Sequence, residues 1–183
     1  MSDNQKTLNS SIEFTGVGLH TGEDVHMVIE PAKINHGVKF QRIDLENQPI
    51  LPADINLVTD TQRSTTLEKD NVKIVTVEHL MSALYALGVN NVLIKMDSSE
   101  VPILDGSAKC FVEEIQKVGL KVQDASLKYI YLPDPIHYTD PVSGSEILFV
   151  PTNNFIISVV LDYQNLALGT QYAEIRDLKD YST

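Results

Sequence analysis

Residues 71–96, NVKIVTVEHLMSALYALGVNNVLIKM, combine two hydrophobic periods within one short stretch. Residues 71–75 favour a strand, and apolar residues then recur at helical spacing as far as Gly88, a residue type that commonly ends helices. Thr76, directly before the helical segment, is the predicted N-cap. Residues 92–96 have the alternating pattern of a second strand. The stretch therefore predicts a strand, a helix and a strand, and so a mixed α and β fold.

The flanking sequence extends this pattern into a sheet with two helices. Residues 6–45 contain the short alternating runs of several strands. A turn at Asp105-Gly106 followed by an N-cap at Ser107 predicts a second helix, which ends at Gly119. We therefore expect an α+β domain with two layers, a sheet plus helices, over residues 1–125.

The remainder of the chain changes to strands, which are predicted at 128–132, 136–139, 146–150 and 155–163. Residues 121–127 predict a connector, and the charged segment 174–180 is the candidate start of a further helix. A sheet with an apolar face needs something to cover it. Residues 126–183 are therefore interpreted as the beginning of a second α+β domain that is cut short. Its uncovered sheet favours self-association.

The composition indicates a soluble globular protein. Hydrophobic residues make up 43% of the 183 residues. The 14 basic and 25 acidic side chains give a net charge of -11, which would repel a phosphate backbone and disfavours binding of DNA or RNA. The N-terminus lacks the features of a signal peptide and no apolar run is long enough to span a membrane, so we expect a cytoplasmic location. The single cysteine, Cys110, cannot form an internal disulfide.

Glu78 and His79 are adjacent in the first turn of the predicted helix. A histidine can bind a metal ion, and a glutamate beside it can accept a proton from water. Neighbouring helix residues point about 100° apart, so the pair cannot chelate one ion, but it can place the imidazole on the metal and the carboxylate near the water. The alternative is a first-turn Glu favoured by the helix dipole next to a surface His. Spacing alone favours that alternative.

Other apparent motifs fail on spacing. The glycine-rich residues 16–22 have Thr21 where a dinucleotide-binding loop needs its third glycine. His20 within them is either a packing residue, which is the favoured interpretation, or a group that lines a pocket. Asp105 and Ser107 have turn and cap roles that explain them better than a catalytic triad does. The remaining histidines lack the spacing of metal ligands: His26, His36 and His137.

Three segments occur in an order and at a spacing typical of one enzyme family. They are TGVGLHTG at 15–22, IVTVEHLMSALYALGVNNV at 74–92 and EVPILDGSAKCF at 100–111. Together they resemble the zinc-dependent UDP-3-O-acyl-N-acetylglucosamine deacetylases of lipid A biosynthesis. The resemblance implies an enzyme that removes the N-acetyl group from an acylated UDP-sugar, releasing acetate and a free amine, in the committed step of lipid A synthesis. It also implies two similar α+β units, of the ribosomal S5 domain 2-like type, that face one another across the active site.

The resemblance assigns roles to four residues. In this family two histidines and an aspartate bind one zinc ion, a glutamate activates water, and a further histidine acts with a lysine and a threonine. On this chain His79 matches the first zinc ligand and Glu78 the general base. Leu19 and Ser64 match positions that line the mouth of the acyl site, although residues 61–66 follow the family pattern only loosely.

The family's remaining ligands would lie beyond Thr183. We therefore predict an N-terminal fragment of a longer enzyme, inactive alone, in which zinc binding is weak or absent. In some lineages the longer protein is fused to a hydroxyacyl carrier-protein dehydratase. Two alternatives remain: a non-catalytic α+β binding or assembly module, and a ribosomal-type nucleic-acid module that the charge of -11 disfavours.

Overall fold

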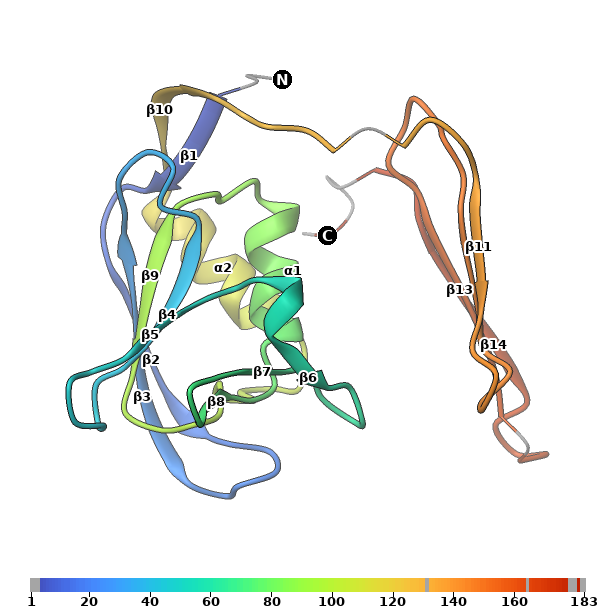
Figure 1. The fold of residues 1–183 in the computed structure, drawn as a ribbon, viewed down its shortest axis with the longest axis horizontal. Helices are drawn as coiled ribbons and strands as arrows, with labels where there is room; N and C mark the ends of the chain where they lie inside the picture. Colours follow the sequence, from blue (N-terminus) through green and yellow to red (C-terminus); the bar gives the residue numbers. More distant parts are fainter. Residues whose placement is uncertain (1–3, 131, 164, 178–180, 182–183) are drawn as a thin grey trace. The chain divides into compact units, whose positions relative to one another are not determined.

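The strand, helix and strand predicted within residues 71–96 are all present in the computed structural model, which describes residues 4–130, 132–163, 165–177 and 181. They are β8 (Val72–Ile74), α1 (Glu78–Ala86) and β9 (Val92–Met96), and Figure 1 shows them within the first part of the chain. Gly88 follows α1 with a φ of 71° and ends the helix, as predicted. The chain divides into two units, residues 1–127 and 128–183, and each is described by itself.

The start of α1 differs from the prediction. Val77 occupies the N-cap position and no side chain caps the helix. Thr76 has a φ of 59°, which is a strained conformation for a β-branched residue. Its hydroxyl donates to the carboxylate of Glu100 instead of to the helix. The predicted N-cap at Thr76 is therefore wrong, because a partner distant in the sequence takes the hydroxyl.

A five-stranded sheet forms the centre of the first unit. Its strand order is β2-β3-β9-β4-β5, with β4 and β9 parallel and the other neighbours antiparallel. Ile29, Ile94 and Met96 on the inner strands are fully buried. The α+β class is thereby confirmed, and Figure 1 shows both helices on one side of this sheet. The other four strands of this sheet are β2 (Ile12–Val17), β3 (Asp24–Pro31), β4 (Val38–Arg42) and β5 (Ile50–Pro52).

The second helix, α2 (Lys109–Val118), packs against β2. The rings of Phe14 and Phe111 meet edge to face, with centroids 5.1 Å apart and an interplanar angle of 68°. The backbone N-cap is Ala108, one residue later than predicted. The Ser107 hydroxyl oxygen nevertheless accepts from the Lys109 N–H at 3.1 Å, at the first residue of the helix, while the hydroxyl donates to Asp105. Among the described residues, no helix is both long and apolar enough to cross a bilayer.

Two smaller sheets complete the first unit. One contains three strands in the order β6-β7-β8, and the other pairs β1 with β10 in antiparallel fashion. The connector predicted at 121–127 is wrong, because most of it belongs to β10. Its pairing with a strand near the N-terminus is a long-range contact that the local pattern does not contain. The elements are β1 (Asn4–Leu8), the 3-10 helix η1 (Ile55–Leu57), β6 (Val58–Asp60), β7 (Thr66–Lys69) and β10 (Leu120–Ser126).

The second unit contains two antiparallel hairpins: β11 (Ile136–Thr139) with β12 (Glu146–Phe149), and β13 (Ile157–Asp162) with β14 (Thr170–Ile175). Three of the four predicted strands are present, but described residues of 128–132 lie in no strand, and residue 131 is outside the described residues. The helix start proposed at 174–180 is wrong at Glu174 and Ile175, which belong to β14, whereas 178–180 lie outside the described residues. Many of the apolar side chains in these hairpins are exposed.

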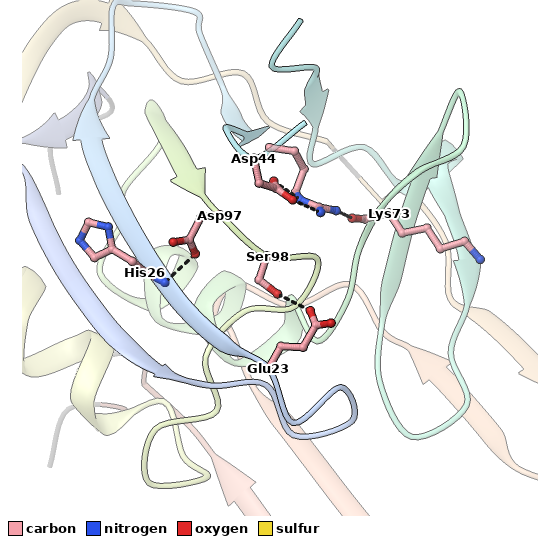
Figure 2. Close-up of polar contacts among 7 residues, drawn as sticks. Glu23, His26, Asp44, Lys73, Asp97 and Ser98 are labelled. Atoms are coloured by element: carbon pink, nitrogen blue, oxygen red, sulfur yellow. Dashed lines mark hydrogen bonds and ion pairs between the residues drawn. The ribbon is translucent and has the colours of Figure 1, made fainter. Parts of the chain in front are cut away.

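A buried arginine connects β4 to β8. Arg42 donates from Nε and Nη2 to both oxygens of Asp44, at 2.9 and 2.6 Å, and from Nη1 to the carbonyl oxygen of Lys73 at 3.1 Å (Figure 2). This bidentate geometry is the strong form of an arginine–carboxylate pair. The hydrogen bonds from Arg42 hold the pKa of Asp44 below its usual value, against the opposing effect of burial, and the charge of Arg42 adds to the lowering.

We expect Asp44→Asn to destabilise the protein at neutral pH by about 1 kcal/mol, because a partly exposed pair is screened by solvent. A lowered pKa in the folded state means that the unfolded state binds more protons in acid. The contribution of Asp44 is therefore complete above its unfolded value near 3.8 and is lost as the pH falls through the lower folded value. Urea denaturation at several pH values measures this.

The control for this prediction is Glu46→Gln, which removes an exposed carboxylate from the same loop. It should leave the pH dependence of stability unchanged. A stability difference between the wild type and Asp44→Asn that stayed constant from pH 7 down to pH 2 would contradict the assigned cause.

Candidate functional site

Glu78 and His79 begin α1, and both side chains are half-buried. Glu78 Oε2 accepts a hydrogen bond from the Thr65 backbone N–H at 2.9 Å. The Thr65 carbonyl oxygen in turn accepts from the Val77 N–H at 3.3 Å. One oxygen of the carboxylate is therefore anchored, and among the described residues no hydrogen bond or ion pair involves Oε1.

Ser64 lies beside this anchor, because its neighbour Thr65 makes both contacts with the start of α1. Ser64 is only 9% exposed. Arg63 before it has a φ of 64°, so the loop turns sharply just ahead of β7. The structure thus brings the loop that contains Ser64 next to Glu78, although the two residues come from different elements.

His79 offers an imidazole that is not engaged elsewhere. In the part of the chain that the structure describes, no hydrogen bond or ion pair involves its ring, and its backbone carbonyl accepts from the Ser82 hydroxyl at 2.8 Å. No group of three His, Cys, Asp or Glu residues that could hold a metal occurs among the described residues. The imidazole has the chemistry to fill one position of a tetrahedral metal site, with a carboxylate beside it, and such a site would need further ligands from outside the described residues.

Leu19 and His20 lie in the turn between β2 and β3, and both are exposed. Leu19 is 57% exposed, so its apolar side chain is available for contact with another molecule or segment. The favoured interpretation of His20 as a packing residue is wrong, because His20 is exposed in the turn. Its backbone N–H is instead the engaged group, and it donates to Glu100.

Glu100 is the residue that sequence reasoning missed. It is fully buried, yet it accepts from the hydroxyl of Thr76 and from backbone and side chain of the turn before β3. Burial raises the pKa of Glu100, but the hydrogen bonds from Thr76, Thr21 and His20 together hold it below its ordinary value. The sequence signal that could have found Glu100 is an acidic residue directly before the apolar pair Val101-Pro102. A carboxylate that is buried with such residues needs several hydrogen-bond donors around it.

The comparisons with known proteins agree with the resemblance. The family model described as UDP-3-O-acyl N-acetylglycosamine deacetylase matches residues 5–182. The bifunctional enzyme LpxC/FabZ of Bacteroides thetaiotaomicron is 44% identical over 177 residues, which is 97% of this chain and 38% of the relative. The UDP-3-O-acyl-N-acetylglucosamine deacetylase of Chromohalobacter salexigens is 42% identical over 167 residues, which is 91% of this chain and 54% of the relative.

The chain thus spans between 38% and 54% of the length of these relatives. The family match nevertheless covers nearly all of this chain, including the α1 start and the turn before β3. The resemblance drawn from the three sequence segments is confirmed at the level of the family. The chain belongs to the UDP-3-O-acyl N-acetylglycosamine deacetylase family.

Proposed function

We propose that this chain is the N-terminal part of a zinc-dependent hydrolase that converts UDP-3-O-acyl-N-acetylglucosamine to UDP-3-O-acyl-glucosamine and acetate. The observation that carries the proposal is the start of α1, where an anchored carboxylate lies next to an imidazole that forms no hydrogen bond or ion pair with the described residues. Family membership and the names of the relatives support the substrate class. Zinc, when bound, would polarise the amide carbonyl and make water a better nucleophile.

The residues of this chain have separate roles in the proposed reaction. His79 supplies one metal ligand. Glu78 accepts the proton from the attacking water on Oε1, while the Thr65 N–H holds Oε2 and so fixes the orientation of the carboxylate. Leu19 and Ser64 contribute to the mouth of the acyl site, one from the turn before β3 and the other from the loop before β7.

Residues 1–183 alone should have little activity and bind zinc weakly, because one imidazole cannot replace three protein ligands. We propose that the remaining ligands come from a further part of the protein and that residues 126–183 begin a second repeat of the ribosomal S5 domain 2-like type. The relatives named bifunctional enzymes support a fusion to a dehydratase in the longer protein. Self-association through the exposed hairpins and a cytoplasmic location remain predictions.

The test is a deacetylation assay of the full gene product with the acylated UDP-sugar, in which mass spectrometry follows the free amine and acetate. We expect turnover that depends on zinc, and none from residues 1–183 alone. A full-length, zinc-loaded protein that releases no acetate would contradict the proposal. A coding sequence that stops near residue 183 would instead favour the non-catalytic binding or assembly module.

A further inference from the structure

One buried carboxylate contacts two segments that lie far apart in the sequence. Glu100 Oε2 accepts from the backbone N–H groups of His20 and Thr21, at 3.0 and 2.8 Å, and from the Thr21 hydroxyl at 2.9 Å. Its Oε1 accepts from the Thr76 hydroxyl at 2.7 Å. The first set of donors belongs to the turn before β3, and the last donor lies just ahead of α1. Glu100 therefore connects the turn to the start of the helix.

The turn closes directly onto this carboxylate. A Cβ atom added at Gly18 would lie 2.5 Å from Glu100 Oε2 and 2.3 Å from the Thr21 hydroxyl oxygen. Both distances are too short for carbon–oxygen contacts, so a side chain at this position would displace the turn or the carboxylate. The absence of a side chain at Gly18 is what allows the turn to wrap around Glu100.

On the side of the helix, the contact is made by Thr76, whose backbone is strained. Thr76 has a φ of 59°, a backbone conformation that a β-branched residue rarely adopts. Its side chain is buried and its hydroxyl is bound to Glu100. Val75 forms a parallel bridge with Glu100, which places the carboxylate beside the residues that lead into Glu78.

The residues just before Glu100 hold the base of the same hairpin. The Asp97 carboxylate accepts from the His26 backbone N–H at 2.7 Å, and the Ser98 hydroxyl donates to Glu23 at 3.2 Å (Figure 2). These contacts fasten the body of the hairpin near the end of β9. They do not reach the tip of the turn, which carries Leu19 and His20. The turn is closed on itself by the Gly22 N–H, which donates to the Gly18 carbonyl oxygen, and within the described residues Glu100 joins this tip to the segment before α1.

We propose that Glu100 is a positioning residue, whose carboxylate sets the place of the turn carrying Leu19 and His20 relative to Glu78 and His79. This inference rests on the proposed function, because it assumes that the turn and the helix start act on one substrate. Glu100 is fully buried, so its carboxylate is not open to a molecule bound at the surface. It acts through the turn that touches the substrate.

Glu100→Gln in the full-length protein tests this. Glutamine keeps the shape but loses the charge, and in either orientation its NH₂ group, which only donates, faces the His20 N–H, which lies 3.1 Å from Oε1 and 3.0 Å from Oε2. We expect amide hydrogen exchange at His20 and Thr21 to become about 10- to 100-fold faster, the factor for losing charge-assisted hydrogen bonds. We also expect KM for the acylated substrate to rise about tenfold, with kcat within about threefold of the wild type.

Two further variants provide a second test of the same contact and a control. Gly18→Ala leaves the charge in place but crowds Glu100, and it should speed the same two amides if Glu100→Gln does not fold. Glu30→Gln removes a carboxylate that pairs with Lys95 on the same sheet, and it should change neither the exchange of the turn nor KM.

The outcomes separate the two proposals. Unchanged exchange at His20 and Thr21, or faster exchange that is equal at the core amide of Ile94, would overturn the positioning role, because the latter pattern indicates general destabilisation. Fast exchange confined to the turn with an unchanged KM would also overturn it. A wild-type protein without deacetylase activity would overturn the proposed function, and the exchange measurement would still show whether Glu100 holds the turn.

Discussion

Replacing Glu78 by glutamine in the full-length protein is expected to lower kcat for deacetylation by about 10²- to 10⁴-fold, the usual contribution of a general base. The amide oxygen of glutamine can still accept the Thr65 N–H that now binds Oε2. The fold and the loop before β7 should therefore stay in place. What is lost is the ability to take up a proton, because an amide is not basic near neutral pH.

The measurement is steady-state kinetics on the acylated UDP-sugar, with zinc content determined on the same samples. A matched control is Glu68→Gln, which removes a carboxylate that pairs with Lys73 in the neighbouring three-stranded sheet. We expect that control to retain activity within about twofold, as is usual for an exposed pair of small energetic value. Full activity in the Glu78 variant would remove Glu78 from the mechanism.

His79→Ala in the full-length protein is expected to abolish stoichiometric zinc binding and, with it, deacetylation. Changes to residues that only support a metal ligand cost about 10- to 100-fold in metal affinity, so the loss of a direct ligand should cost more than about 100-fold. The imidazole is half-buried and makes no other side-chain hydrogen bond or ion pair within the described residues, so stability should change little.

Metal analysis after gel filtration and a competition titration against a chelator measure this effect. His26→Ala serves as the control, because within the described part of the chain its ring is partly exposed and lies 3.6 Å from the Glu13 carboxylate. The control should keep one zinc ion per chain. An unchanged zinc affinity in the His79 variant would place the metal elsewhere in the protein.

The local elements were largely predictable from the sequence. The strand of residues 92–96 and the helix that ends before Gly88 follow from hydrophobic periods that depend only on near neighbours. The predicted cap at Thr76 failed because its hydroxyl was assigned to the nearest helix, whereas the fold gives it a partner 24 positions away, Glu100. In the described part of the chain, the Ser107 hydroxyl has only near neighbours as partners, and it does accept from the first residue of α2.

The strand β10 was missed because it depends on a partner that is distant in the sequence. Leu120–Ser126 alternates only weakly between apolar and polar residues, and it becomes a strand because β1 provides the matching hydrogen-bond partners. A sequence window of ordinary length cannot contain both strands. Isolated pairs of strands are also marginal in water, so their formation depends on the rest of the unit.

The sequence by itself determined that Glu78 and His79 are adjacent, that they begin a helix, and to which family the chain belongs. Covalent adjacency and helical periodicity are local properties, and they do not depend on the remainder of the fold. The tertiary structure alone decided that Thr65 anchors one oxygen of Glu78 and that Glu100 joins the turn of His20 to the start of α1. The Glu100–His20 bond spans 80 positions of the chain, and such a contact exists only once the sheet has brought its two segments together.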